Sequence, residues 1–410
     1  MARNHLRRRT APGYRLGRAA IVATVAAILA TVAVPVLLGA GPPQDPPGAI
    51  VAAFARPSYR PGDSAVLVLR RPVRGTVTVA PAWTLVGAVP YAPATRVNST
   101  RVHVRVPSRS GLYVAVVSSG RRIGYAPLVV RPRRLGDARV LVVLPTNTWQ
   151  AYNFRGGDSW YFDPAVHTID LRRPFVSPGL PPHFRSYDLN FQTWLARHGK
   201  HPDVIADEDL DAIASGDELA RRYDLVVFPG HEEYVTPHMY DLVARYRDLG
   251  GNLAFLSADN LFYRVAYGEG RRLMTGRQRF RDLGRPEAAL IGAQYVDWNH
   301  DLYGNRPYVV ADTHAAPWLF RGTGLHDGSV IPGSFGIEID ARTPESPRGT
   351  LVLARIANEF GPGKTAEMTY YRTARGAKVF AAGTINFGGA ARNPVVSRLL
   401  ANLWDWLRRP

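Results

Sequence analysis

Two polar stretches decide the fold of this chain: Pro145-Thr146-Asn147-Thr148-Trp149-Gln150-Ala151-Tyr152-Asn153 and Pro229-Gly230-His231-Glu232-Glu233-Tyr234. Each directly follows a short apolar run, residues 140–144 in the first case and 225–228 in the second. Short continuous apolar runs are typical of strands in a parallel sheet that helices cover on both faces. Polar residues at the carboxyl ends of such strands meet in a crevice, so the two stretches predict a doubly wound α/β domain with a functional cleft.

The sequence around these stretches alternates strands with amphipathic helices from residue 136 to residue 410, which indicates right-handed βαβ units. One helix is expected over residues 188–199, with Asp188 as its cap and Gly199 at its end. A second begins at Thr236-Pro237 and ends at Gly250-Gly251. Residues 366–371 and 378–383 suggest a hairpin, residues 394–407 a closing helix, and the region around residues 298–318 a loop-rich insertion.

The part that precedes this domain, residues 49–133, carries short alternating runs instead. Examples are residues 65–69, 102–106 and 113–117, separated by turn signals that contain glycine and proline. This spacing is typical of an antiparallel β-sandwich, and we expect an immunoglobulin-like module. The chain contains no cysteine, so the module has no disulfide and depends on its apolar core.

The first 40 residues have the pattern of a membrane anchor. Residues 19–40 are uncharged and mostly apolar, long enough to cross a bilayer, and the preceding residues 1–18 carry six arginines. The positive-inside rule then places residues 1–18 in the cytoplasm and the rest of the chain outside, as a single-pass protein of the cell membrane. A cleaved signal peptide is the alternative, and we favour the uncleaved anchor because the basic segment is long.

The charge balance of +18 raises the possibility of nucleic-acid binding. Among the 51 basic residues only Lys200, Lys364 and Lys378 are lysines, a bias that suggests a GC-rich bacterial genome. No basic stripe interleaved with aromatic residues is present, so we expect no nucleic-acid partner. The absence of cysteine also excludes a cysteine nucleophile, although the strand, turn and helix at 228–236 match the place where glutamine amidotransferase-like domains carry one.

Several motifs resemble the large subunit of N,N-dimethylformamidase and its relatives. They are residues 145–153, Gly230-His231-Glu232-Glu233-Tyr234, Gly250-Gly251-Asn252-Leu253 and Val379-Phe380-Ala381-Ala382-Gly383. The resemblance implies a glutamine amidotransferase-like fold and an enzyme that hydrolyses the C–N bond of a small amide. It also implies a mononuclear iron held by two tyrosines and a glutamate, hard oxygen donors that suit ferric iron.

Carried over residue by residue, the resemblance implies Tyr152, Glu233 and Tyr113 as metal ligands. It implies His231, Asn260 and Glu367 as catalytic residues. Five of these residues also have a simpler explanation: Tyr152 and Tyr113 as packed aromatic rings, Glu233 as a residue favoured by a helix N-terminus, His231 as a capping or pairing residue there, and Asn260 as a turn residue. The large subunit works with a small partner in the cytoplasm, whereas this chain is expected to be anchored in a membrane, so its substrate and oligomeric state stay open.

Two functions remain open from the sequence. The first is a membrane-anchored extracytoplasmic hydrolase, dependent on iron, that acts on a small amide-like substrate. The second is a non-catalytic cell-surface binding protein that uses the same cleft and the sandwich to recognise a glycan or a peptide. Iron in the purified protein would favour the enzyme, and a metal-free protein would favour the binding protein.

Overall fold

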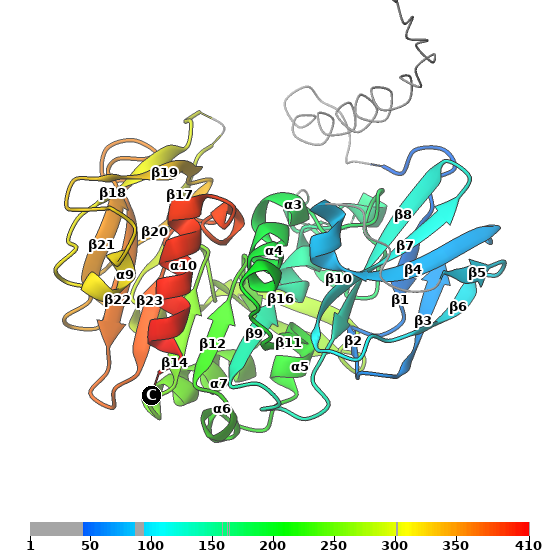
Figure 1. The fold of residues 1–410 in the computed structure, drawn as a ribbon, viewed down its shortest axis with the longest axis horizontal. Coiled ribbons are helices and arrows are strands. Elements are labelled where there is room, and N and C mark those ends of the chain that lie inside the picture. The colour runs from blue at the N-terminus through cyan, green and yellow to red at the C-terminus, as the bar shows by residue number, and fades with distance from the viewer. Residues whose placement is uncertain are drawn as a thin grey trace, which may run out of the picture. The chain divides into compact units, whose positions relative to one another are not determined.

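A nine-stranded sheet with helices on both faces forms the larger part of the structure (Figure 1). The computed structural model describes residues 44–409, apart from residues 87–93, 158, 162, 164 and 301. In spatial order the sheet contains β11 (Asp203–Ala206), β9 (Val140–Leu144), β12 (Leu225–Phe228), β14 (Asn252–Phe255), β23 (Lys378–Ala381), β22 (Ala366–Arg372), β21 (Leu351–Ile356), β18 (Arg306–Val310) and β19 (Val330–Phe335). The expected mixture of strands and helices is confirmed.

The first five strands of this sheet run parallel to one another. Numbered along the chain, they lie in the order 2-1-3-4-5, so the direction of winding reverses between β9 and β12. The segments that leave the carboxyl ends of β9 and β12 therefore diverge, and a crevice opens between them. These two segments are the polar stretches 145–153 and 229–234.

Alternate residues of the parallel strands enter two separate cores. Val140, Val142 and Leu144 of β9 pack in one core, while Leu141 and Val143 pack in the other. The first core includes side chains of α4 (Leu189–Arg197) and α10 (Pro394–Leu407), and the second includes side chains of α6 (Gly216–Arg222) and α7 (Pro237–Asp248). A strand buried on both faces must be apolar at every position, which explains the continuous runs in the sequence.

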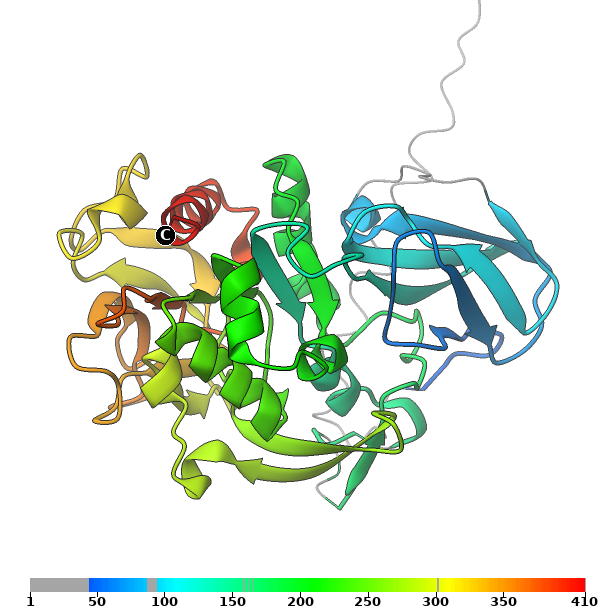
Figure 2. The same ribbon diagram turned by 90° about the horizontal axis from the view of Figure 1, so that it is seen from below.

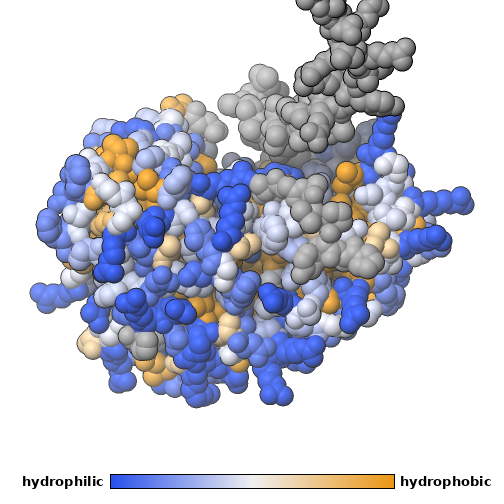
Figure 3. Space-filling view, in the orientation of Figure 1, coloured by the Kyte–Doolittle hydropathy of each residue, from blue (hydrophilic) through white to orange (hydrophobic). Residues whose placement is uncertain are grey.

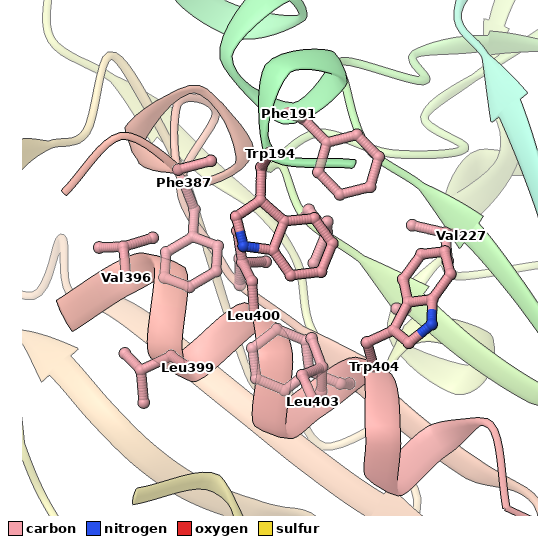
Figure 4. Packing of buried hydrophobic residues seen from close by; sticks show 14 of the residues in the cluster. Phe191, Trp194, Val227, Phe387, Val396, Leu399, Leu400, Leu403 and Trp404 are labelled. Atoms are coloured by element: carbon pink, nitrogen blue, oxygen red, sulfur yellow. The ribbon is translucent and has the colours of Figure 1, made fainter. Parts of the chain in front are cut away.

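The closing helix α10 covers the sheet with large apolar side chains. Asn393 caps it by accepting hydrogen bonds from the backbone N–H groups of Val395 and Val396, and Pro394 occupies the first turn. Trp404 packs against Trp194 of α4, with ring centroids 5.9 Å apart, and Figure 4 shows the leucines of α10 in the same cluster. The helix predicted for residues 394–407 is confirmed.

The two predicted internal helices form, but one of them is capped differently. Thr236 caps α7 by accepting a hydrogen bond from the N–H of Met239, as the Thr-Pro pair predicts. Asp188 makes no capping hydrogen bond to α4, so its predicted role as a cap is wrong. The chain approaches α4 through the short helix α3 (Phe184–Tyr187), and Asp188 lies between the two helices in a helical conformation, from which a capping side chain cannot reach the next N–H groups.

The sandwich consists of two sheets that share one apolar core. One sheet contains β1 (Ala52–Phe54), β3 (Ser64–Leu69) and β6 (Arg101–Arg105). The other contains β2 (Ser58–Tyr59), β8 (Arg122–Val130), β7 (Gly111–Ser119), β4 (Gly75–Pro81) and β5 (Thr95–Val97). Inward residues such as Ala65, Leu67 and Leu69 are buried while their neighbours on β3 are more exposed, which is the alternation that the sequence shows.

The region that the sequence left least defined contains more strands than expected. β15 (Tyr263–Gly268) and β16 (Leu273–Arg279) form a hairpin at the centre of a four-stranded sheet, with β10 (Thr168–Asp170) beside β16 and β13 (Tyr234–Val235) beside β15. This hairpin is the long yellow-green pair of strands near the lower edge of Figure 2. β17 (Gln294–Trp298) pairs with β20 (Glu338–Ala341). Because β18 falls within residues 298–318, a loop-rich insertion describes that range only in part.

Residues from Gln44 onward form one contact unit, which holds both the sandwich and the large sheet. The expected anchor, residues 19–40, lies outside the described residues. In the described part of the chain, no helix combines the length and apolar character needed to cross a membrane. The face shown in Figure 3 is mostly polar, with small separate apolar areas.

Candidate functional site

Three loops at the carboxyl ends of adjacent parallel strands build the site. The loop after β9 begins with α2 (Thr146–Ala151), which places Tyr152 at its end. The loop after β12 carries His231 and Glu233, and the loop after β14 carries Asp259, whose φ is +53°. Hydrogen bonds join the loops: the N–H of Glu233 donates to Thr148 Oγ1 at 3.1 Å, and the N–H of Leu261 donates to the carbonyl of Glu232 at 2.7 Å.

His231 lies at the centre of the site among three carboxylates. Its Nε2 is 3.2 Å from Glu338 Oε2, 3.5 Å from Glu233 Oε2 and 3.6 Å from Asp259 Oδ2. The side chains of His231, Glu233 and Asp259 are 7%, 5% and 5% exposed, and that of Glu338 is 14% exposed. Within the described residues, no arginine or lysine forms an ion pair with these carboxylates, so His231 is the cation that faces them.

The carboxylates determine the protonation of His231. Burial alone lowers the pKa of His231, but the negative charge of Glu338 and the contacts with Asp259 and Glu233 outweigh burial and raise the pKa well above its usual value. Burial raises the pKa of Asp259 well above the ordinary range and that of Glu233 to about 7. The site therefore holds several protons near neutral pH, on groups that can exchange them.

Two tyrosines surround the carboxylate of Glu233. Hydrogen bonds from Tyr152 and Tyr234 lower the pKa of Glu233, against the larger effect of burial. The Tyr152 ring meets the His231 ring edge-on at 5.5 Å and stacks on Tyr161 at 5.1 Å. Burial first, and then the charge of Glu233, raises the pKa of both phenols well above 10, so in the absence of a metal ion both hydroxyls keep their protons.

Glu232 points to a different group of residues. Its buried carboxyl lies near that of Asp207, whose Oδ2 accepts a hydrogen bond from the N–H of Asn147 at 2.7 Å. Burial first, and then the charge of Asp207, raises the pKa of Glu232 well above its usual value, and burial raises that of Asp207 to about 7. The pair links the turn after β12 to α2 and to the end of β11, which makes its role structural.

Asn260 joins two of the loops. Its Oδ1 accepts a hydrogen bond from the N–H of Glu232 at 3.3 Å, and its Nδ2 donates to the carbonyl of Ser257 at 3.1 Å. The side chain is 2% exposed, and its bond to Glu232 holds the loop after β12 against the loop after β14. Asn260 therefore positions the backbone between His231 and Glu233.

The structure places two of the expected site residues elsewhere. Tyr113 lies on β7 in the core of the sandwich, where its hydroxyl donates to the carbonyl of Arg109 at 3.2 Å. Glu367 lies on β22 and accepts hydrogen bonds at 3.1 Å from both the backbone N–H and the guanidinium of Arg342. The structure thus brings Tyr152, Glu233, His231 and Asn260 together, while Tyr113 as a ligand and Glu367 as a catalytic residue stay predictions.

Three residues of the site had not been chosen from the sequence. Tyr234 and Asp259 directly neighbour residues that had been chosen, Glu233 and Asn260, and their positions just after strands were a usable signal. Glu338 had no such signal, because it comes from β20 in the region without clear periodicity. Its pairing with β17 across a register shift carries it to His231, a long-range arrangement that no local pattern encodes.

A separate small cavity of about 70 Å³ lies between the sandwich and α2. Phe54 and Arg56 line it from the sandwich, and Trp149 and Arg172 line it from the other side. Tyr152, Glu233, Asp259 and Glu338, which surround His231, do not line this cavity. The stretch 145–153 thus contributes to two separate places, this cavity and the site around His231.

Comparison with known proteins identifies relatives of one kind. The family model described as "N,N-dimethylformamidase beta subunit-like, C-terminal" matches residues 89–397. The N,N-dimethylformamidase beta subunits of Alcaligenes sp and Paracoccus aminophilus are each 25% identical to this chain, over 260 and 258 residues. Each alignment covers 50% of this chain and 34% of the relative, so the match spans about a third of the relatives' length.

A solved structure of the mmIFT52 N-terminal domain aligns with 54% of this chain and 90% of its own. The sequence identity is 12% and the TM-score is 0.32, too low to establish a shared fold.

Proposed function

Because the chain belongs to the N,N-dimethylformamidase beta subunit-like, C-terminal family, we propose that it is a hydrolase that cleaves the C–N bond of a small amide. The observation that carries the proposal is the meeting of Tyr152, His231 and Glu233 at the switch point between β9 and β12. These residues come from two of the stretches that carry the resemblance, and both lie within the matched residues 89–397. The relatives are longer than the match, so the substrate of the whole enzyme is part of the proposal.

An iron ion is part of the proposal, with Tyr152 and Glu233 as ligands. Both supply hard oxygen donors, and Glu233 Oε2 is buried without making a hydrogen bond within the described residues, so it retains a free donor site. The resemblance implies Tyr113 as the second tyrosine ligand of the iron. In the structure, the tyrosines beside Glu233 are Tyr152 and Tyr234. When bound, iron would supply a Lewis acid that polarises the amide carbonyl.

The side chains of the site can supply the proton transfers that amide hydrolysis needs. The oxygen of a water molecule adds to the carbonyl carbon, the C–N bond breaks, and the leaving nitrogen takes up a proton. His231 is protonated at neutral pH and can give the proton on Nε2 to the departing amine. Glu338 or Asp259, each close to the same nitrogen, can take the proton of the water and return it to His231.

The setting of this site forms the rest of the proposal. We infer that the parallel sheet corresponds to a glutamine amidotransferase-like, flavodoxin-like domain, which the strand order 2-1-3-4-5 supports. The two-sheet module supports the immunoglobulin-like interpretation. Residues 19–40 would anchor the chain in the cell membrane with the hydrolase outside the cytoplasm, an interpretation that depends on the sequence alone.

The test is hydrolysis of N,N-dimethylformamide and other small amides by the purified chain, together with iron analysis. We expect stoichiometric iron, a phenolate-to-iron absorption band, and release of the amine. In Tyr152→Phe we expect loss of the band and at least a 100-fold fall in kcat/KM, because the hydroxyl that ligates iron and contacts Glu233 is gone. Tyr125→Phe, on β8 of the sandwich, is the matched control and should keep both the band and the activity.

An unchanged band and unchanged turnover in Tyr152→Phe would remove this tyrosine from the site. A protein that contains no iron and releases no amine from any amide in the panel would contradict the hydrolase. Binding of glycans or peptides by such a protein would then favour the non-catalytic cell-surface binding protein.

A further inference from the structure

The loop that follows α2 packs two aromatic rings against the proposed active site. We call residues 153–177 the wall loop. The Trp160 ring lies 5.2 Å from the Tyr234 ring, and the Tyr161 ring stacks on the Tyr152 ring at 5.1 Å. Both contacted tyrosines are the ones that surround the proposed iron-binding carboxylate.

Tyr161 lies on the solvent side of this wall. It is 53% exposed, whereas Trp160 is 4% exposed and Tyr234 is 2% exposed. An exposed ring that stacks on Tyr152 is placed to meet a substrate that approaches the proposed ligand from solvent. The position of the wall loop is therefore expected to influence substrate binding.

Asp45 binds both ends of the wall loop. Near the start of the loop, Arg155 donates hydrogen bonds from both terminal nitrogens to the Asp45 carboxylate, one of them at 2.6 Å. At the end of the loop, the N–H of Ser177 donates to Asp45 Oδ1 at 2.9 Å. Arg155 also donates to the carbonyls of Pro174 and Phe175, each at 2.9 Å. One carboxylate from the segment before the sandwich thus joins the two ends of the loop.

The pair between Arg155 and Asp45 is shielded from water. Their side chains are 15% and 14% exposed. Burial alone raises the pKa of Asp45, but the hydrogen bonds from Arg155 and from the N–H of Ser177 outweigh burial and lower the pKa below its ordinary value. Two parallel hydrogen bonds between a guanidinium and a carboxylate also fix the orientation of both groups. Loss of one partner leaves the other charge buried without compensation, so removal of the Asp45 carboxylate should release the loop.

We propose that Asp45 is a positioning residue of the site, because it holds the wall loop and with it the rings of Trp160 and Tyr161. Its effect on turnover rests on the proposed hydrolase, whereas its hold on the loop does not. Asp45 lies between the apolar run 19–40 and the matched residues 89–397, so a part of the chain outside the family match supplies this contact. The segment that follows the proposed anchor would thereby control the shape of the cleft.

The proposal predicts a change in KM rather than in kcat. The hydrogen bonds of Asp45 go to the wall loop, and the groups that transfer protons lie around His231. For N,N-dimethylformamide we expect Asp45→Ala to raise KM about tenfold and to change kcat by less than about threefold, because the loop positions the substrate and does not transfer protons. A role of Asp45 in stability alone would leave the KM of the folded enzyme unchanged.

Hydrogen exchange of the full chain, followed by mass spectrometry, reports on the loop without any turnover. The N–H of Trp160 donates to the carbonyl of Ala151 at 2.9 Å, so it exchanges slowly while the loop is held. We expect peptides that contain Trp160 to exchange at least about tenfold faster in Asp45→Ala. Asp224→Ala is the matched control, since it also removes an arginine–aspartate pair with two hydrogen bonds, to Arg139, but at the amino ends of β9 and β12. It should leave both the exchange at Trp160 and KM unchanged.

Circular dichroism checks that each variant is folded, and Asp45→Asn, which keeps the size of the side chain, replaces Asp45→Ala if the latter does not fold. Three results would overturn the proposal: unchanged exchange at Trp160, faster exchange with an unchanged KM, and equal changes in Asp224→Ala. A failure of the hydrolase is distinct, because the unmodified chain then releases no amine. The exchange experiment still decides in that case whether Asp45 holds the loop.

Discussion

At the scale of single residues, the site depends on carboxyl groups that the protein buries instead of exposing. Glu232, Glu233, Asp188, Asp207 and Asp259 are each at most 4% exposed. Burial without a cationic partner raises the pKa of a carboxyl group and makes the folded state dependent on pH. Such concentrations of perturbed groups are common at functional sites, where the cost in stability serves the chemistry.

Asp188 allows this cost to be measured away from the proposed ligands. Burial raises its pKa to about 8, while the unfolded chain has a value near 3.8. Between these values the folded state holds a proton that the unfolded state has lost, so Asp188 lowers the free energy of unfolding as the pH rises from about 4 to 8. We expect Asp188→Asn to be more stable than the unmodified chain at pH 8, by more than about 1 kcal/mol, and similar to it at pH 4.

Urea unfolding at both pH values measures this difference. Asp241→Asn is a suitable control, since the side chain of Asp241 is 64% exposed and pairs with Arg285. A stability difference that is the same at pH 4 and pH 8 would show that Asp188 is not protonated in the folded protein.

At the scale of secondary-structure elements, the close connection between α7 and β14 depends on the absence of a side chain. A Cβ at Gly251 would lie 2.3–2.5 Å from the Tyr246 ring, which is fully buried between α7 and the sheet. The ring cannot move without opening the core, because it also donates a hydrogen bond from its hydroxyl to the carbonyl of Tyr223. The Gly-Gly pair therefore ends the helix and also allows the ring to pack.

We expect Gly251→Ala to lower the free energy of unfolding by about 2–4 kcal/mol, as overpacking and a displaced buried ring both cost stability. Gly304→Ala is the control, because a Cβ at Gly304 meets no atom within 4 Å. Thermal unfolding of the two variants side by side gives the difference. Equal stability would mean that the Tyr246 ring shifts freely.

The elements that could be predicted from the sequence are those with a local physical cause. The apolar runs of β9 and β12, the Thr236-Pro237 start of α7 and the Asn393-Pro394 start of α10 carry their own signals. The hairpin of β22 and β23 also forms where the sequence predicts it. β17, β18 and β20 were missed, because their residues are only partly buried and show weak alternation, so their pairing depends on distant partners.

The same distinction applies to the candidate site. His231, Glu233, Tyr152 and Asn260 follow strands whose ends converge, and parallel topology alone predicts their proximity. Glu338 could not be found in this way, since its place is set by a strand pair outside the parallel sheet. Glu367, a catalytic residue implied by the resemblance, lies on a late strand with its carboxylate against Arg342.

At the scale of the whole described molecule, the sandwich supports the edge of the large sheet. β11 is the last strand at that edge, and Ser110 of the sandwich bonds to its backbone. The Ser110 hydroxyl accepts a hydrogen bond from the N–H of Val204 at 2.8 Å and donates to its carbonyl at 3.3 Å. Nearby, the Ser58 hydroxyl donates a hydrogen bond to the Asp209 carboxylate at 2.8 Å, and Arg131 pairs with the same carboxylate.

We expect Ser110→Ala to lower the free energy of unfolding by about 1–3 kcal/mol, since it leaves two buried backbone groups without partners. Ser119→Ala is the matched control, because its hydroxyl bonds to the carbonyl of Arg74 at an exposed position. Hydrogen exchange at Val204, measured by mass spectrometry, should be faster in Ser110→Ala only. Unchanged protection of β11 would show that the sandwich does not support this strand.

The bonds of Ser110 also cover part of an exposed sheet edge. An uncovered edge strand presents a row of unpaired N–H and C=O groups, and two such edges from different molecules can pair and cause aggregation. Ser110 of the sandwich hydrogen-bonds to the N–H and the carbonyl of Val204, so these two groups are not available to pair with a strand of another molecule. Expression of residues 136–410 without the sandwich should therefore give a protein whose main defect is precipitation.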